Sequence, residues 1–540
     1  MKRTLSAIAS CLGSILLAYG QIVTEVSVKP GSFKIETSQD GISTIIYTGA
    51  TSVESREGYP ALPIVERRFY LASDKEDITL AVEVVSDQQL EGKYCIDIAK
   101  IQKAQAGEGG EEVGELNSDY DSEVAARVIS DIKVFDCRIV TIAMYPFAYS
   151  QQNQTLRVRD IKVRIDSDGT MDMSEMLPNT TLQRRMLCEQ YVQSAVDNPD
   201  DAKGLFQCKN TQPNHLAAAP QRRVNERFTV RLYHDDPVIP DFIIITNEAL
   251  KPSFDRLAEW KTKRGIYTIV ETTEYITSHY DGVDLCEQIR NYIAEKEQNW
   301  GYALSFLLGG GINVIPSREY NGKEHVEVTD IYYVDRESHQ PNGTNTFYSI
   351  SINSLIGRFP VDNRSEADLL IDKVISYENT MNIDYSYLDN HLYVDAYLRV
   401  NGTTDGAMPF IRQYAANGNY LQRNSLFLFD SYEQETSISG HAPYIWKGYP
   451  LRKDAFLEAL SNGDEEMGNF HFVSHLDHSL PRTMGASDKK HEESITGSEI
   501  DDLDFPANYC QIVLSSGCHT ADFTTDCIAK RFLMKQNSRA

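Results

Sequence analysis

Two predicted strands near the C-terminal end of the chain are followed directly by residues whose side chains could take part in catalysis. Residues 470–479 (FHFVSHLDHS) place His475 and His478 at the end of one strand, and residues 511–519 (QIVLSSGCH) place Cys518 at the end of another. A thiol becomes an effective nucleophile at neutral pH when an imidazole lies beside it, and the imidazole can then protonate a departing amine. The pattern therefore predicts a Cys–His pair that cleaves an acyl bond.

The spacing of the two groups suits neighbouring parallel strands. Cys518 follows His478 by 40 positions, which leaves room for one crossover connection. The order of the two residues and their approximate separation match the caspase type of cysteine peptidase.

The same residues allow other interpretations. A cysteine at a strand end is more often a small buried hydrophobic residue than a nucleophile. His471, His475 and His478 could bind a metal, but no acidic or thiol partner at metal-ligand spacing completes a zinc site. Gly309-Gly310-Gly311 lacks the spacing of a nucleotide-binding loop, which favours a tight chain reversal there.

After residue 228, the predicted elements that would position these groups are strands that alternate with helices. Strands are predicted at 241–246, 266–270 and 303–308 and helices at 250–264 and 283–296, with further strands at 352–357, 425–429, 469–474 and 509–515. The uninterrupted apolar run 241–246 is typical of a strand buried on both faces. Right-handed crossovers then predict a mostly parallel sheet with helices on both faces, and polar groups should gather at its carboxyl edge.

The preceding part of the chain has a different character. Residues 21–167 alternate polar and apolar in short runs, which predicts a β-rich domain, and residues 156–165 keep period two around one slip, which indicates a bulge. Residues 168–227 form a connector with a predicted helix at 181–195, and Arg222, Arg223 and Arg227 lie at its end. Residues 1–20 have the charged start, apolar centre and small-residue end of a signal peptide, with cleavage expected before Gln21.

Composition excludes several functions. The 540 residues include 52 Lys and Arg against 78 Asp and Glu, a net charge of −26, which disfavours nucleic acid as a partner. No apolar run after residue 20 is long enough for a membrane span. The eight cysteines after residue 20 form no CxxC pairs, so spacing assigns neither a zinc site nor a disulfide.

A series of short motifs runs in order along most of the mature chain. It comprises residues 241–246, Trp260-Lys261, Arg264-Gly265, Ile289-Arg290, Leu307-Leu308-Gly309, Ile315-Pro316-Ser317-Arg318, Thr329-Asp330, Gly357-Arg358-Phe359-Pro360-Val361 and Tyr377-Glu378. In this order the motifs resemble the catalytic domain of the gingipain-type (C25) cysteine peptidases, which share the caspase-like fold. Residues 58–63 and Tyr145-Pro146 resemble the β-rich propeptide of that family.

The resemblance implies an exported cysteine endopeptidase zymogen of a Gram-negative bacterium, located in the periplasm, at the cell surface or outside the cell. Cys518 takes the place of the nucleophile and His478 that of the catalytic histidine, with His475 as the alternative. Backbone N–H groups of Cys518 and Ser479 would stabilise the oxyanion. Protein or peptide substrates and the chain's own prodomain, residues 21–167, are the implied partners, and no cofactor or metal is expected.

Several positions depart from the family pattern. Asp477 and Ser479 flank the histidine where glycines are common, Ala521 replaces the glycine after the cysteine, and Gly311 and Lys530 replace acidic residues. The chain also ends at Ala540, where family members continue with another strand and helix of the catalytic sheet. These differences support an alternative hypothesis, in which the chain is a catalytically impaired homologue that acts as a binding or scaffold module.

Overall fold

The computed structural model describes residues 21–38, 41–54, 56, 58–72, 78–98, 116–166, 180–206, 239–321, 326–336, 350–379, 385–396, 423–429, 443–486, 493–505 and 510–535. The predicted signal peptide and the arginines at 222, 223 and 227 lie outside these residues. No helix of the described ranges is both long enough and apolar enough to cross a bilayer.

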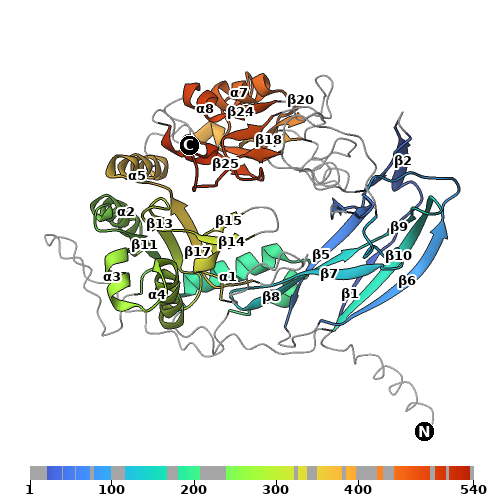
Figure 1. Cartoon of the computed structure of the whole chain (residues 1–540), viewed down its shortest axis with the longest axis horizontal. Helices are drawn as coiled ribbons and strands as arrows, with labels where there is room; N and C mark the ends of the chain where they lie inside the picture. The colour runs from blue at the N-terminus through green and yellow to red at the C-terminus, as the bar shows by residue number, and fades with distance from the viewer. Residues whose placement is uncertain are drawn as a thin grey trace, which may run out of the picture.

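The described residues from 21 to 206, which we call the N-terminal half, contain mainly antiparallel sheets (Figure 1). In one sheet β10 (Thr155–Asp166) lies between β1 (Gln21–Val26) and β6 (Leu80–Gln89), and β9 (Phe147–Ser150) also pairs with β10. The other sheet contains β7 (Ala126–Val134), β8 (Cys137–Met144), β5 (Pro63–Leu71) and β4 (Ser52–Val53), while β2 (Phe33–Thr37) and β3 (Ser43–Tyr47) form a hairpin. The register of β10 against β6 shifts between Asp160 and Ile161, which confirms the predicted bulge.

The first parallel sheet has the order β12 (Thr268–Thr272), β11 (Phe242–Thr246), β13 (Ser305–Gly309) and β17 (Leu355–Phe359). Helices α2 (Lys251–Lys263), α3 (Thr273–His279), α4 (Leu285–Trp300) and α5 (Arg364–Glu378) accompany it. Ile243 belongs to a core with residues of α4, and Ile244 belongs to a separate core with residues of α2 and α5. Both faces of β11 are therefore covered, which explains its uninterrupted apolar sequence.

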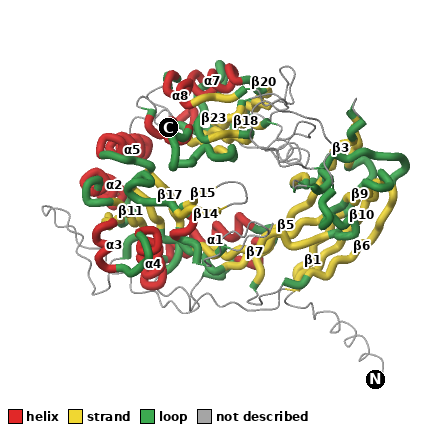
Figure 2. The backbone as a smooth tube through the Cα atoms, viewed as in Figure 1, coloured by secondary structure: helices red, strands yellow, loops and turns green. Residues whose placement is uncertain are grey.

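A second parallel sheet follows, so the single mostly parallel sheet expected from the sequence is divided into two. Its order is β20 (Trp446–Pro450), β19 (Asn424–Phe429), β18 (Asn390–Asp395), β21 (Phe472–Leu476) and β25 (Ile512–Ser515). It has its own core, in which Leu392, Val394 and Val473 pack with Phe456 of α7 (Lys453–Asn462). Figure 2 shows helices around both parallel sheets and mainly strands in the N-terminal half.

Shorter elements complete the second sheet. A small antiparallel sheet of β22 (Ser479–Leu480), β23 (Thr483–Gly485) and β24 (Ser494–Thr496) comes directly after β21. Two helices, α8 (Gly497–Asp502) and α9 (Ile528–Met534), pack on each other, and α9 also contacts α5. In the first α/β unit, β14 (Arg318–Asn321) and β15 (Val326–Thr329) form a separate hairpin.

Two features join the N-terminal half to the first parallel sheet. Strand β16 (Ser351–Ile352) pairs in parallel with β7, and the N–H groups of Lys133 and Phe135 donate to the carbonyls of Ile350 and Ile352 at 2.7 and 2.8 Å. Helix α1 (Leu182–Ala195), capped by Thr181, confirms the helix predicted at 181–195. It packs on β8 and, through Arg184, donates to the carbonyls of Trp300 and Tyr302 at 2.8 and 2.9 Å.

Candidate active site

The strands that carry the predicted histidine and cysteine are neighbours. Strands β21 and β25 pair in parallel, with His475 opposite Ser515, and the N–H of Ser516 continues the ladder by donating to the His475 carbonyl at 2.8 Å. Parallel strands end at the same edge of a sheet. The segments that follow, with His478 and Cys518, therefore leave the sheet side by side.

Gly517 and Ser479 show how closely these two segments approach. A Cβ atom built on Gly517 would lie 2.2 Å from Ser479 Oγ and 2.7 Å from Ser479 Cβ. Gly517 directly precedes Cys518, and Ser479 directly follows His478. Position 517 therefore requires glycine, because the Cβ of any other residue would overlap with the side chain of Ser479.

Cys518 is exposed, whereas the other cysteines of the described ranges are buried or half-buried. It lies in a turn that is bonded on both sides: Thr520 Oγ donates to the Gly517 carbonyl at 3.1 Å, and the N–H of Asp522 donates to the His519 carbonyl at 3.0 Å. His519 has a φ of 57°, a left-handed conformation that is uncommon for residues other than glycine. The turn thus presents the thiol at the surface on a constrained backbone.

His478 lies between two buried residues. Its backbone N–H donates to Asp477 Oδ1 at 2.6 Å, and the Asp477 side chain packs against the backbone of Gly485. Ser479 is buried, pairs with Met484 in the ladder of β22 and β23, and accepts from the Gly485 N–H at 3.3 Å through its hydroxyl. The histidine itself is half-buried, so its buried neighbours anchor the segment while His478 stays partly exposed.

His475, the alternative catalytic histidine, is placed differently. It is 2% exposed and stacks on Phe456 of α7 with 5.9 Å between ring centroids. Its Nδ1 lies 2.9 Å from Ser515 Oγ and its Nε2 lies 2.9 Å from the Gly485 carbonyl oxygen. Burial lowers the pKa of His475, the largest effect on it, so the ring is held neutral inside the core.

His471 also has hydrogen bonds at both ring nitrogens. Its Nε2 lies 2.9 Å from the hydroxyl of Tyr377, and its Nδ1 lies 3.3 Å from the Leu388 carbonyl oxygen. The described residues contain no group of three or more His, Cys, Asp or Glu side chains placed to hold a metal ion. His471 and His475 make hydrogen bonds to different partners.

Two of the departures from the family pattern meet at one side chain. A Cβ atom on Gly311 would lie 2.4 Å from Asp362 Oδ1, and Lys530 of α9 pairs with Asp362 at 2.6 Å and with Glu366 at 3.6 Å. An aspartate at 311 would bring two carboxylates together, and a glutamate at 530 would add a third acid beside Asp362 and Glu366. The changes at 311 and 530 are thus physically coupled through Asp362.

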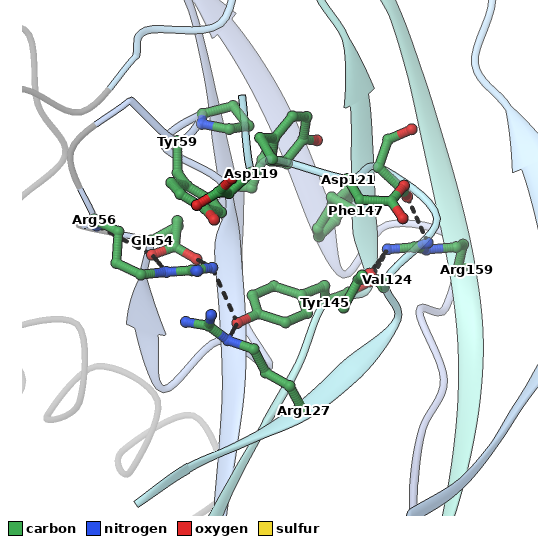
Figure 3. Close-up of a pocket in the computed structure, with 14 residues that line it drawn as sticks. Glu54, Arg56, Tyr59, Asp119, Asp121, Val124, Arg127, Tyr145, Phe147 and Arg159 are labelled. Carbon is green, nitrogen blue, oxygen red and sulfur yellow. Dashed lines mark hydrogen bonds and ion pairs between the residues drawn. The ribbon is translucent and has the colours of Figure 1, made fainter. Parts of the chain in front are cut away.

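A partly open pocket of about 90 Å³ lies far from this site in the sequence, entirely within the N-terminal half (Figure 3). Arg56 lies over the ring of Tyr59 and pairs with Glu54, and Arg127 Nε donates to the hydroxyl of Tyr145 at 2.7 Å. The buried Arg159 donates to three backbone carbonyls, those of Ser122, Val124 and Tyr145. These contacts hold the loop before β7 against the turn between β8 and β9.

Sequence reasoning missed three residues of the site. Ser515, Gly485 and Thr520 contact the two segments through hydrogen bonds that depend on strand register and on a tertiary turn. Ser515 could have been found from the period of two along β25, which places it on the same face as Val513. Nothing in the local sequence indicates the roles of Gly485 and Thr520.

The model of peptidase family C25 matches residues 235–540. The chain belongs to peptidase family C25. This membership confirms the resemblance inferred from the motifs, and the α/β fold with its β-rich N-terminal part agrees with it. No curated protein matches the chain significantly.

Among solved structures, the C25 chain is similar to the complex of Porphyromonas gingivalis RgpB pro- and mature domains, with 17% identity, a TM-score of 0.38 and coverage of 54% of this chain and 59% of that chain. It is similar to the Arg-specific cysteine proteinase gingipain R (RgpB), with 19% identity, a TM-score of 0.39 and coverage of 55% and 59%. A structure on the zymogenic latency of gingipain K from Porphyromonas gingivalis matches with 15% identity, a TM-score of 0.21 and coverage of 28% and 90%. The chain thus spans about three fifths of the first two relatives.

Proposed function

We propose that this C25 chain is a cysteine endopeptidase in which Cys518 is the nucleophile and His478 the general acid and base. The observation that carries the proposal is the approach of Gly517 to Ser479, in which the backbone of Gly517, beside Cys518, lies against the side chain of Ser479, beside His478. The exposure of Cys518 and the left-handed backbone of His519 add support, since strained conformations cluster at functional sites.

The proposed reaction is acyl transfer to sulfur. His478 takes the thiol proton, the sulfur of Cys518 forms a bond to the scissile carbonyl carbon, and the oxygen becomes an oxyanion. Collapse of this intermediate breaks the C–N bond as His478 gives its proton to the departing amine, which leaves a thioester on Cys518. Water, deprotonated by His478, then hydrolyses the thioester. The N–H groups of Cys518 and Ser479 are the proposed oxyanion donors, each worth about 2.7–4 kcal/mol in comparable enzymes.

A thiol-directed covalent probe tests the assignment. We expect one fast-labelling site that disappears in Cys518→Ala and labels more slowly in His478→Ala. Cys95→Ser is the matched control, because Cys95 is the half-buried cysteine of the described ranges, and it should leave the fast site intact. If Cys518 labels at the wild-type rate in a folded His478→Ala variant and more slowly in His475→Ala, the catalytic histidine is His475 and not His478.

The competing function is a binding or scaffold module, which Asp477, Ser479 and Ala521 favour because they replace residues that the family pattern has beside the reactive groups. Under this alternative, several cysteines would label at similar rates and the folded protein would turn over no peptide. Fast labelling at Cys518 alone, together with peptide hydrolysis that Cys518→Ala abolishes, supports the endopeptidase.

We also propose that the protein is exported and made as a zymogen whose N-terminal half is removed by cleavage near Arg222, Arg223 or Arg227. The contacts of β16 and α1 described above hold this half against the first parallel sheet. Limited proteolysis should cut first between residues 222 and 227 and raise peptide turnover. Cleavage there with no gain in turnover, in a preparation that remains folded, would contradict the zymogen proposal.

A further inference from the structure

Gly517, which precedes Cys518, makes a hydrogen bond to a side chain through its N–H and another through its carbonyl. The N–H of Gly517 donates to Ser515 Oγ at 3.1 Å, and the carbonyl of Gly517 accepts from Thr520 Oγ at 3.1 Å. We call Ser515 and Thr520 the Gly517 clamp. Thr520 is buried, and its own carbonyl accepts from the N–H of Ala529 at 3.0 Å, so the clamp is fixed to the chain beyond the turn.

The Thr520 side of the clamp determines where the N–H of Cys518 points. The carbonyl of Gly517 and the N–H of Cys518 belong to the same peptide unit, which is planar and trans. The two bonds therefore point in opposite directions. When Thr520 binds the carbonyl oxygen, the N–H of Cys518 is directed away from Thr520 and away from the interior of the turn.

The Ser515 side of the clamp is oriented by His475. The Gly485 carbonyl, 2.9 Å from Nε2, can only accept a hydrogen bond, so the network assigns the proton of the neutral ring to Nε2. His475 Nδ1 is then an acceptor for the hydroxyl proton of Ser515. A lone pair of Ser515 Oγ remains for the N–H of Gly517, and the hydrogen bonds run in one direction from Gly517 to Gly485.

The network returns to the histidine segment. The N–H of Gly485 donates to Ser479 Oγ at 3.3 Å, and Ser479 is the residue that contacts Gly517. A closed path therefore connects Gly517, Ser515, His475, Gly485 and Ser479 and involves β21, β22, β23 and β25. Neither His478 nor Cys518 needs to be part of this path to be positioned by it.

We propose that Ser515 and Thr520 are positioning residues that aim the N–H of Cys518 at the oxyanion. The inference rests on the proposed function, since an oxyanion forms only if Cys518 attacks a carbonyl. An oxyanion donor is effective when it is held in place before the reaction. The clamp supplies this pre-organisation without contacting the substrate, and His475 serves it as a buried support and not as a base.

The test uses isosteric variants of Thr520. Thr520→Val keeps the shape and removes the hydroxyl, whereas Thr520→Ser keeps the hydroxyl. We expect Thr520→Val to lower kcat for peptide hydrolysis at least about tenfold, with KM within about threefold of wild type, because loss of a complete oxyanion donor costs roughly 100- to 1,000-fold. Thr520→Ser should restore most of kcat.

Alkylation of Cys518 by iodoacetamide separates positioning from damage to the thiol. This displacement at a saturated carbon forms no oxyanion, so its rate should be the same in wild type and Thr520→Val. Equal losses of kcat and alkylation rate in Thr520→Val would show that the hydroxyl supports the thiol or the fold, and would overturn the proposal. Wild-type kcat in Thr520→Val would overturn it as well.

Ser515→Ala gives a second, independent arm with a control on the same sheet. Ser474 Oγ lies 2.8 Å from His391 Nε2, so Ser474→Ala removes a serine–histidine hydrogen bond of similar length on the opposite face. We expect Ser515→Ala to lower kcat while Ser474→Ala does not, at matched thermal stability. Equal effects of the two variants contradict the clamp, whereas full activity of Cys518→Ala would refute the proposed function itself.

Discussion

Gly517→Ala is the substitution whose effect can be worked out most directly from the structure. The new Cβ would lie 2.2 Å from Ser479 Oγ and 2.7 Å from Ser479 Cβ, whereas ordinary contact begins at 3.4 Å. The segments beside Cys518 and His478 must then separate by about 1 Å. A displacement of this size at reacting groups costs about 100-fold in rate, or about 2.7 kcal/mol of transition-state stabilisation.

Ser479 provides the rescue and its control. Ser479→Gly removes both atoms that collide, so Gly517→Ala/Ser479→Gly should recover kcat/KM to within about tenfold of Ser479→Gly alone. Ser479→Ala keeps the Cβ at 2.7 Å, so Gly517→Ala/Ser479→Ala should remain impaired. The assay is peptide hydrolysis by all five variants, with circular dichroism to confirm folding. Wild-type activity in Gly517→Ala, or equal rescue by Gly and Ala at 479, would refute the packing argument.

Three further predictions concern charged groups. Burial lowers the pKa of Lys373 to about 8, below its ordinary 10.5. Between these two pH values the unfolded chain binds more protons than the folded chain, so the unfolding free energy should rise with pH by about 1 kcal/mol per pH unit. Urea denaturation across this pH range measures the rise, and Lys373→Met should abolish it. Arg184→Met removes the side chain that donates to the carbonyls of Trp300 and Tyr302, and each lost hydrogen bond should lower the unfolding free energy by about 1–3 kcal/mol. Hydrogen exchange of the backbone amides in α1 should therefore accelerate. Unchanged exchange would show that other contacts hold α1. Lys530→Glu should destabilise the protein by about 1 kcal/mol or less, and adding Asp362→Lys should recover the loss.

Local patterns in the sequence were sufficient for several elements. The apolar run of β11, the helix α1 and the bulge in β10 each depend on residues close together in the chain. Helix α1 begins where Thr181 can cap it, and β11 is apolar throughout because both of its faces are covered. The adjacency of the strands that lead to His478 and Cys518 was also predicted from their order, and the pairing of β21 with β25 confirms it.

Features that depend on pairing between distant segments were not predictable from the sequence. The division into two parallel sheets follows from β18, which pairs with β19 and β21 and has no ladder with β17. The two-residue strand β16 is too short to show any periodicity. The Gly517 clamp requires the register of β21 against β25, because a shift by one residue would turn Ser515 to the other face. The roles of His478, Cys518 and Ser479 stay predictions until they are tested.

The pairing of β16 with β7 has a consequence for how the two halves of the chain can change over evolution. The β16–β7 ladder consists of hydrogen bonds between main-chain atoms, which nearly every amino acid can make, but just beyond it the N–H of Asp136 donates to the side chain of Asn353 at 3.1 Å. Ser351 is buried and Ile352 packs against the core of the first parallel sheet, so packing limits changes there, whereas proline in place of Lys133 or Phe135 removes a donor. Arg184 and Asn353, whose side chains cross the joint between the halves, are therefore the positions where a change in one half must be matched in the other.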